Sequence, residues 1–372
     1  MATTMFDPLY YPPMGTPKNR LPTPALLISL PDLEFNLSLM SGFYCNKSTK
    51  LRPHFKTHKC PVIAKKQIEL GAIGITCAKL SEAEVLVNAG ISNILIANQV
   101  VAPEKISRLA ALAGSCQLIV AVDQYDNLEK IAKAAASIGN TVHVVIEVDV
   151  GLHRAGVQPG KPALELARKA VNLQGIHFSG LLGYEGFSKF DVDCDVRSQH
   201  AQAAMKALMD SASLIQRDGI PIEMISAGGT PTYDLIGRVP GVTEVEAGSY
   251  VFMDSSYNRI GLDFKQSLTL LAMVTSIQGA NQCIIDAGLK VLATDHGLPK
   301  ISIPDDLILI KMNEEHGIIE YDPSNAHPEV GMCIEIIPSH ACTTVNLHDR
   351  YYVIQDDKLV DIWEISARGK SQ

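Results

Sequence analysis

The chain has 372 residues, of which 47% are hydrophobic and 19% charged, and its formal net charge is −8. This length predicts one large domain plus a smaller one, and the apolar content allows each of them to bury a core. The acidic balance, with a pI near 5.8, argues against the basic surface that nucleic-acid binding requires, so we expect no nucleic-acid partner.

The sequence shows no sign of a membrane or secretory protein. No apolar run reaches the length of a membrane span, and the first residues lack the charged and apolar segments of a targeting leader. We therefore expect a cytoplasmic protein with no membrane partner. The eight cysteines are spread through the chain without a CxxC pair, which is typical of reduced, buried thiols rather than of a disulfide framework.

Short β-rich runs alternate with helical segments over residues 51 to 252. We expect strands at 51–56, 74–78, 93–98, 117–123, 142–149, 178–184, 224–228 and 244–251. Amphipathic helical segments lie between them at 81–89, 104–113, 127–138, 162–172 and 198–217, and Ser81 with Glu84 has capping-box spacing. Runs such as 117–122 are apolar on both faces, as a parallel sheet covered by helices requires. The pattern predicts an α/β fold, a TIM-like (β/α)8 barrel over residues 20–262. An open doubly wound sheet is the alternative, but no GxGxxG follows the first strand.

The pattern changes after the barrel segment. Residues 263–372 have little helical periodicity and many short strand candidates, at 268–277, 283–286, 307–312, 332–337, 351–354 and 359–363. Asp356-Asp357-Lys358 separates the last two as a hairpin turn would. We therefore expect a C-terminal β domain after the barrel.

In such a barrel, the chemistry lies at the carboxyl ends of the strands. Lys56 is at the end of the first strand, in the run Arg52-Pro53-His54-Phe55-Lys56-Thr57-His58-Lys59. A lysine amine forms a Schiff base only when it is unprotonated, and the flanking cationic residues favour that state. The alternative is a basic loop on the barrel rim.

Two glycine-rich turns follow the seventh and eighth strands, at 226–230 and 246–250. Loops at these two places commonly bind phosphate in this fold, because bare backbone N–H groups converge there on an anion. A lysine for an aldehyde together with amides for a phosphate describes pyridoxal phosphate.

With these motifs, the sequence resembles the fold-type III pyridoxal phosphate enzymes, the group of alanine racemase and ornithine decarboxylase. It is most similar to their D-serine dehydratase and D-threonine aldolase branch. The motifs that carry this resemblance occur in order along the chain from about residue 23 onward, at 53–59, 149–156, 226–232, 314–317 and 338–346. The resemblance implies a barrel, a β domain and a homodimer.

The resemblance also implies roles for individual residues. Lys56 would bind the cofactor covalently and act as the base at the substrate Cα. Arg154 would contact the cofactor's phenolic oxygen, although a rim salt bridge is its alternative. Tyr184 would contact the ring or only pack. The phosphate would be held by Gly228, Gly229, Thr230, Gly248, Ser249 and Tyr250.

Glu246 occupies the place where racemases of this group carry an arginine and decarboxylases a glutamate. A carboxylate there favours a protonated pyridine ring, and hence chemistry that delocalises a carbanion rather than simple racemisation. The alternative is a solvated surface glutamate.

His340 and Cys342 are one residue apart in an expected strand, so their side chains would lie on one face and reach the same ion. Imidazole and thiolate suit zinc, with manganese or magnesium as further possibilities. Without the resemblance, a buried histidine and cysteine is the simpler reading. His316 is a third residue to consider, more as a support than as a ligand.

The function implied by the resemblance is a metal-assisted lyase for a small D-amino acid with a β-hydroxyl group. If Lys56 removes the α-proton and the metal-bound hydroxyl leaves, a 2-oxo acid and ammonia result, as in a D-serine dehydratase. If a base removes the hydroxyl proton instead, the Cα–Cβ bond breaks and glycine and an aldehyde result, as in a D-threonine aldolase. Cys342 favours the dehydratase, with the aldolase second and an amino-acid racemase third. A non-catalytic carrier of pyridoxal phosphate is the alternative from another class.

Overall fold

The computed structural model describes residues 10–187 and 192–372, and these residues divide into two compact units. We call Phe35–Lys265 together with Ile365–Gln372 the barrel unit, and the residues up to Glu34 together with Gln266–Glu364 the β unit. The barrel expected over 20–262 thus lacks the first residues assigned to it. It also includes the last eight residues of the chain, because these contact its loops.

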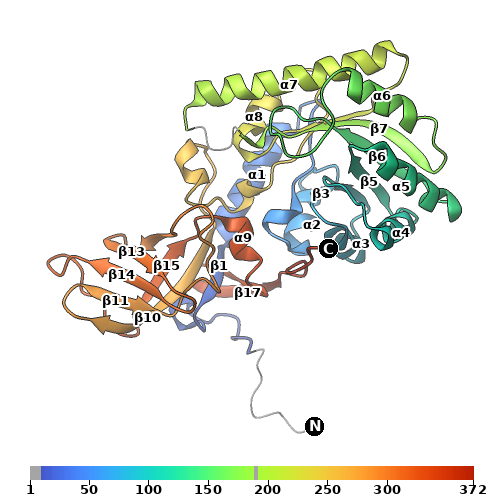
Figure 1. Cartoon of the computed structure of the whole chain (residues 1–372). Coiled ribbons are helices and arrows are strands. Elements are labelled where there is room, and N and C mark those ends of the chain that lie inside the picture. The colour runs from blue at the N-terminus through green and yellow to red at the C-terminus, as the bar shows by residue number, and fades with distance from the viewer. Residues whose placement is uncertain (1–9, 188–191) are drawn as a thin grey trace, which may run out of the picture. The chain divides into compact units, whose positions relative to one another are not determined.

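The barrel unit contains one parallel sheet of eight strands, and each strand lies where the sequence predicted one (Figure 1). In spatial order they are β2 (Lys50–Leu51), β9 (Glu244–Val245), β8 (Met224–Ala227), β7 (Ile176–Gly183), β6 (Val142–Glu147), β5 (Gln117–Val122), β4 (Asn93–Ile96) and β3 (Ile75–Cys77). The two ends of this order are joined by a parallel bridge between His54 and Thr76. The N–H of Thr76 also donates to the carbonyl of Pro53 at 2.9 Å. The predicted α/β barrel is therefore confirmed.

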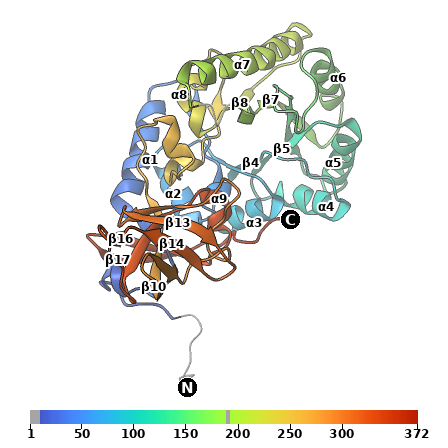
Figure 2. The same cartoon turned by 60° about the vertical axis from the view of Figure 1, so that its left-hand side comes forward.

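Helices stand around this sheet, as the view in Figure 2 shows. They are α2 (Pro61–Glu69), α3 (Leu80–Asn88), α4 (Pro103–Leu112), α5 (Tyr125–Ser137), α6 (Lys161–Ala170), α7 (Cys194–Arg217) and the short α8 (Tyr233–Ile236). Helix α1 (Leu30–Tyr44) begins in the β unit and ends in the barrel unit. Single 3-10 turns lie at η2 (Phe55–Thr57), η4 (Thr230–Thr232), η5 (Ser249–Val251) and η6 (Tyr257–Ile260). The five helical segments predicted from the sequence are confirmed.

The strands form because they are apolar on both faces, which suits a sheet covered by helices outside and side chains inside. One interior cluster consists of buried residues from neighbouring strands, namely Leu95, Ile119, Ala121, Val145, Leu182 and Met224. At Gly180, φ is +152° and an added Cβ would lie 1.8 Å from the carbonyl oxygen of Met224. Only glycine lets β7 approach β8 this closely.

The capping box expected at Ser81 and Glu84 is wrong by two residues. Helix α3 begins at Leu80, and the carboxylate of Glu82 accepts hydrogen bonds from the backbone N–H groups of Ala78 and Lys79 at 2.8 and 3.2 Å. Glu84 instead pairs with Arg108 on the surface. Glu82 thus caps the start of α3, and its buried charge is compensated by a cationic partner that is described below.

The β unit contains a mostly antiparallel sheet. Its main path runs β13 (Leu307–Met312), β14 (Gly317–Tyr321), β11 (Gln282–Ile285), β10 (Leu268–Gln278), β1 (Ala25–Ser29), β16 (Arg350–Gln355) and β17 (Lys358–Glu364). Strand β15 (Cys333–Ile337) pairs with β10 and with β12 (Lys300–Ile303). The 3-10 turn η1 (Lys18–Arg20) and helix α9 (Ala341–Val345) complete the unit.

The six strands predicted for the β unit are present, and β1, β12 and β14 are additional. The turn between β16 and β17 is confirmed, because Asp356 and Asp357 have φ of +50° and +55°, as a tight hairpin turn requires. A buried cluster lies on this sheet, formed by Leu21, Ala25, Leu27, Leu271, Tyr352, Ile354 and Leu359. All eight cysteines are free thiols. Within the described ranges, we find no helix with the length and hydropathy to cross a membrane.

Candidate active site

Lys56 lies in the 3-10 turn η2, just beyond the carboxyl end of β2 rather than within the strand. The turn is fixed at its start because the backbone N–H of Lys56 donates to Nδ1 of His54 at 3.3 Å. The Lys56 side chain is half-buried, and its Nζ lies 5.7 Å from the centroid of the Tyr184 ring. The guanidinium carbon of Arg154 lies 5.5 Å from the same centroid. The structure therefore brings together three of the residues that the sequence singled out.

The cationic surroundings expected for Lys56 are neutralised. Arg52 is buried, and its Nε donates to Oε1 of Glu244 at 2.8 Å. Lys59 is also buried, and its Nζ lies 2.6 Å from Oε1 of Glu82. Each cation has its own carboxylate, so neither acts as the uncompensated positive charge that the sequence suggested beside Lys56.

The two histidines that flank Lys56 are neutral rather than cationic. Burial lowers the pKa of His54 well below its usual range, and the nearby Lys56 lowers it further. Burial lowers the pKa of His58 to about 3, against hydrogen bonds that favour its charged form. Nδ1 of His58 lies 3.2 Å from both the backbone N–H and the carbonyl oxygen of Cys60, so the ring has a hydrogen-bond partner there in either tautomer. Both rings therefore hold the turn through hydrogen bonds made by uncharged imidazoles.

Arg154 forms an ion pair with a buried carboxylate. Its guanidinium lies 3.5 Å from Oε1 of Glu147, the last residue of β6, and Nε2 of Gln99 donates to the other oxygen of Glu147. Neither Glu147 nor Gln99 was found from the sequence. Both stand at strand ends of the barrel, and that position is the signal that could have found them.

The two glycine-rich turns lie side by side. The backbone N–H of Tyr250 donates to Oγ1 of Thr230 at 3.0 Å, which joins η5 to η4. The N–H groups of Thr230, Gly248 and Ser249 are buried, and none of them donates to another residue in the part of the chain that the structure describes. Buried N–H groups normally have an acceptor, so this cluster fits a bound anion such as the cofactor's phosphate.

Not every residue expected to bind the phosphate contributes an unpaired backbone N–H group. The N–H of Tyr250 is occupied by Thr230, and its buried hydroxyl accepts from Nε2 of Gln67 at 2.9 Å. Gly248 packs against the lysine turn, because an added Cβ would lie 2.9 Å from both the carbonyl of His54 and Oγ1 of Thr57. Tyr250 thus joins the two glycine-rich turns, and Gly248 packs the second of them against the lysine turn.

Gly228 and Gly229 lie at the start of the η4 turn. The N–H of Gly228 is bound to the buried carboxyl of Glu185, to which Thr232 donates as well. Burial raises the pKa of Glu185, and these hydrogen bonds oppose the rise. Glu185 follows Tyr184 directly, so one short segment supplies both an aromatic ring near Lys56 and an anchor for the glycine turn.

Glu246 is half-buried, so the alternative of a solvated surface glutamate is wrong. The Ser226 hydroxyl donates to its Oε1 at 2.7 Å. Burial raises the pKa of Glu246 to about 7, and the neighbouring Glu244 raises it as well, whereas the bond from Ser226 and the charges of Lys56 and Arg52 lower it. Near neutral pH this carboxyl therefore exists in both its protonated and its charged form.

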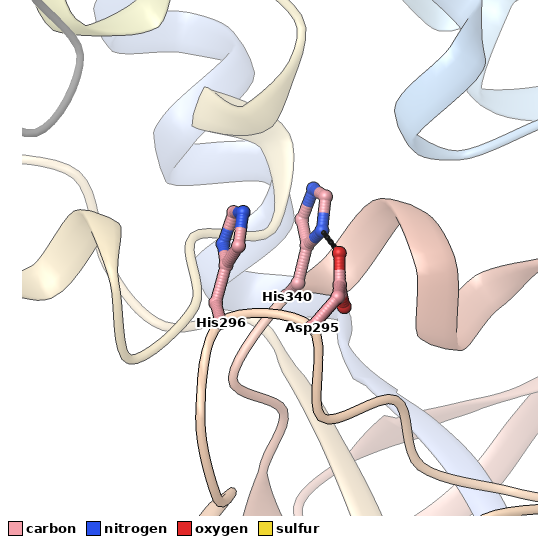
Figure 3. A group of neighbouring side chains, drawn as sticks. All are labelled: Asp295, His296 and His340. Atoms are coloured by element: carbon pink, nitrogen blue, oxygen red, sulfur yellow. Dashed lines mark hydrogen bonds and ion pairs between the residues drawn. The ribbon is translucent and has the colours of Figure 1, made fainter.

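The β unit contains a second group of chemically active side chains. Asp295, His296 and His340 each offer a ligand atom within 4.8 Å of the others, and no other described residues form such a group (Figure 3). Nδ1 of His340 lies 2.6 Å from Oδ2 of Asp295, whose other oxygen accepts from Oγ1 of Thr343 at 2.8 Å. The rings of His296 and His340 are stacked, with centroids 4.0 Å apart.

Cys342 lies next to this group, hydrogen-bonded to His340, but it does not lie in a strand. His340 caps helix α9 and Cys342 lies in its first turn, so the expected strand geometry is wrong. Burial lowers the pKa of His340, but hydrogen bonds and charges from Cys342 and Asp295 outweigh it and raise the pKa to about 9. His316 is exposed and lies outside the group, so Asp295 and His296 take the supporting place considered for it. Imidazole, carboxylate and thiolate together suit a divalent metal ion.

Comparisons with known proteins agree with this arrangement. A family model described as alanine racemase, N-terminal domain, matches residues 28–256, and one described as putative serine dehydratase domain matches residues 267–354. The D-threonine aldolase of Arthrobacter sp. is 38% identical over 362 residues, which cover 96% of each chain.

Two solved structures extend the comparison. The D-threonine aldolase of Filomicrobium marinum has 34% identity and a TM-score of 0.94, and covers 97% of this chain and 100% of its own. The D-threo-3-hydroxyaspartate dehydratase of Delftia sp. HT23 has 30% identity and a TM-score of 0.86, with coverage of 94% and 98%. A mutant D-threo-3-hydroxyaspartate dehydratase has also been solved in a metal-free form.

The fold and the lysine turn define an enzyme of the fold-type III pyridoxal phosphate class. Within that class, the chain belongs to the family that joins an alanine racemase N-terminal domain to a D-serine dehydratase domain, whose members named above are lyases. Pyridoxal phosphate fits the residues of the barrel unit, with an amine at Lys56 and unpaired amides in the glycine turns.

Proposed function

We propose that this chain is a metal-assisted aldolase that cleaves D-3-hydroxy amino acids of the D-threonine type into glycine and an aldehyde. Pyridoxal phosphate supplies an electron sink for the substrate's Cα when it is bound. The metal ion supplies a Lewis acid for the β-hydroxyl oxygen.

The observation that carries the proposal is the group formed by Asp295, His296, His340 and Cys342. Asp295, His296 and His340 offer ligand atoms within 4.8 Å of one another, and Cys342 is hydrogen-bonded to His340. Racemisation changes only the α-hydrogen and needs no such ion. A metal ion that binds the β-hydroxyl oxygen would assist a lyase, so the group supports a lyase over a racemase or a non-catalytic cofactor carrier.

The barrel residues have separate tasks in this proposal. Lys56 would hold the cofactor through its amine, and the amides of Thr230, Gly248 and Ser249 would hold its phosphate. Arg154, supported by Glu147, would face the phenolic oxygen, where a fixed positive charge favours the ionised form. Tyr184 would flank the ring.

Glu246 would face the pyridine nitrogen and exchange a proton with it. A carboxyl with a pKa of about 7 lies close to the range in which a proton can be shared with that nitrogen. We propose this role for Glu246 together with Ser226, whose hydroxyl orients the carboxyl.

Two outcomes remain for a hydroxy amino acid in such a site. Whole-chain similarity supports cleavage of the Cα–Cβ bond, because the Arthrobacter aldolase has 38% identity and the Delftia dehydratase 30%. Cys342 supports the second candidate, dehydration of a D-serine-like substrate to a 2-oxo acid and ammonia. We take cleavage as the first function and dehydration as the second.

A product assay tests this proposal directly. The purified chain is loaded with pyridoxal phosphate and with zinc, manganese or magnesium in turn, and is given D-threonine, D-serine or D-3-hydroxyaspartate. We expect glycine and an aldehyde from D-threonine, and no product after chelation. Ammonia and a 2-oxo acid as the main products would favour dehydration, and unchanged activity in metal-free protein would refute the metal role.

The homodimer expected from the family resemblance, the cytoplasmic location and zinc as the preferred metal remain predictions. Light scattering on the loaded protein measures the first of these, and metal competition measures the last.

A further inference from the structure

Lys59 adopts a backbone conformation that its residue type rarely takes. Its φ is +52°, in the left-handed region that favours glycine. The residue lies three positions after Lys56, at the end of the same turn. Since a lysine is strained here, other interactions of Lys59 must offset the strain.

The side chain of Lys59 supplies the first of these interactions. It is buried, and its Nζ lies 2.6 Å from Oε1 of Glu82 and 3.4 Å from the carbonyl oxygen of Ala367. The other oxygen of Glu82 is fixed by the backbone N–H groups of Ala78 and Lys79. The ammonium of Lys59 is thus tied to the end of β3 and the start of α3.

The backbone of Lys59 supplies the second set. Its N–H donates to the carbonyl of Phe55 at 2.8 Å, which closes the turn around Lys56, and its carbonyl accepts from the N–H of Ala367 at 3.1 Å. The segment that contains Ala367, residues 365–372, belongs to the barrel unit. It is also attached at α3, where Ser81 donates to the carbonyl of Gln372 through both its N–H and its hydroxyl.

These contacts hold the part of the turn that follows Lys56, whereas His54 holds the part that precedes it. His54 holds the N–H of Lys56, whereas Lys59 holds the carbonyl of Phe55 and anchors the end of the turn. With hydrogen bonds on both sides, the backbone of the turn that carries Lys56 is restrained.

We propose that Lys59, through Glu82 and segment 365–372, is a positioning residue that sets the turn for attack by Lys56 on the cofactor's aldehyde. In that step the amine nitrogen of Lys56 bonds to the aldehyde carbon, the carbonyl oxygen leaves as one water molecule, and a C=N bond remains. Lys59 itself touches neither reactant. The inference rests on the proposed use of Lys56, but not on the choice between cleavage and dehydration.

The test separates the covalent step from cofactor binding. Each cofactor-free variant is mixed with pyridoxal phosphate and quenched with borohydride at timed intervals, and the modified lysine is located by peptide mass spectrometry. Pyridoxine 5′-phosphate, which has the phosphate and ring but no aldehyde, measures binding alone. We expect Lys59→Met and Glu82→Gln to slow adduct formation at Lys56 at least tenfold, while pyridoxine phosphate binds within threefold of the original affinity.

Two further variants serve as controls. Lys59→Arg keeps a cation that can reach Glu82 and should restore most of the rate. Lys206→Met removes a lysine of an exposed ion pair, 2.6 Å from Asp210 on α7, and should leave the rate unchanged.

Wild-type rates in both Lys59→Met and Glu82→Gln would overturn the inference. A parallel loss of pyridoxine phosphate binding would also overturn it, because that result indicates a collapsed site. If Lys59→Met does not fold, Glu82→Gln, which keeps an acceptor for the helix start, decides by the same two criteria. If the original chain forms the adduct but cleaves no hydroxy amino acid, the proposed function fails while this inference stands.

Discussion

Replacing Glu246 by glutamine should change how the stability of the cofactor-free protein depends on pH. In the folded chain the pKa of this carboxyl is raised from 4.5 to about 7, mainly by burial. Below pH 4.5 both states carry the proton and the group contributes no pH dependence. As pH rises to about 7, the unfolded chain releases its proton first, so the folded state loses stability relative to the unfolded one.

The size of the effect follows from that shift. A full pKa shift of this kind lowers the free energy of unfolding by about 3 kcal/mol between pH 4 and pH 8, since one pKa unit corresponds to about 1.4 kcal/mol. Because the side chain is only half-buried, we expect about 1–2 kcal/mol. Glu246→Gln keeps an oxygen for the Ser226 hydroxyl but has no proton to release. Its stability relative to the original chain should therefore rise by that amount between the two pH values.

Urea unfolding followed by circular dichroism, at half-unit steps of pH, measures this difference. Glu69→Gln, at an exposed position at the end of α2, controls for the loss of one negative charge. A difference between Glu246→Gln and the original chain that stays flat from pH 4 to pH 8 would refute the reasoning. A difference that falls with pH would reverse its sign and show that the folded state favours the ionised form.

The remaining predictions concern the cofactor and the metal. Lys56→Ala should abolish the borohydride-trapped adduct and lower activity by about 10³-fold or more, and an adduct on another lysine would contradict the assignment. Gly248→Ala should destabilise the protein by about 1–3 kcal/mol and weaken pyridoxine phosphate binding, because its Cβ meets the lysine turn at 2.9 Å. Gly229→Ala, with its nearest contact at 3.5 Å, should be tolerated, and equal losses in both variants would speak against steric packing as the cause. Asp295→Asn should lower divalent-metal affinity about 10- to 100-fold by calorimetry, and an unchanged affinity would remove Asp295 from the site. Cys342→Asp should shift metal competition from zinc towards manganese or magnesium, and an unaltered preference would show that the thiol does not select the ion.

The barrel could be predicted because its strands are apolar on both faces and are separated by amphipathic helices, a local pattern. The end of the first strand was less predictable. Hydrogen bonds to the β9 segment continue past Leu51, because the N–H groups of Arg52 and His54 donate to the carbonyls of Val245 and Ala247, and the chain turns only at Phe55. The residue type of the lysine indicated its chemistry, while the charges of Arg52 and Lys59 are compensated by Glu244 and Glu82, which are distant in sequence.

The candidate metal site could be predicted from the sequence even less completely than the lysine turn. The spacing of His340 and Cys342 predicted a shared strand face, but a short helix forms there, and only the family resemblance favoured a metal site over a buried histidine and cysteine. Asp295 lies 45 residues before His340 in an irregular loop, and no periodic pattern links the two. Contacts of this kind depend on the tertiary fold, so only the resemblance to a known family hinted that more ligands were needed.

Strand β1 gives the β unit an unusual assembly order. It pairs antiparallel with β10 and parallel with β16, so the first strand of the described residues lies between two strands made about 240 and about 325 residues later. On the ribosome, this apolar segment must therefore wait without its partners while the whole barrel sequence is synthesised. A fragment that starts at residue 263 would lack the strand that joins the two halves of its sheet, and would leave two strand edges open to aggregation. Expression of the β unit by itself would therefore require residues 10–34 to be joined to it, for example as a circular permutant.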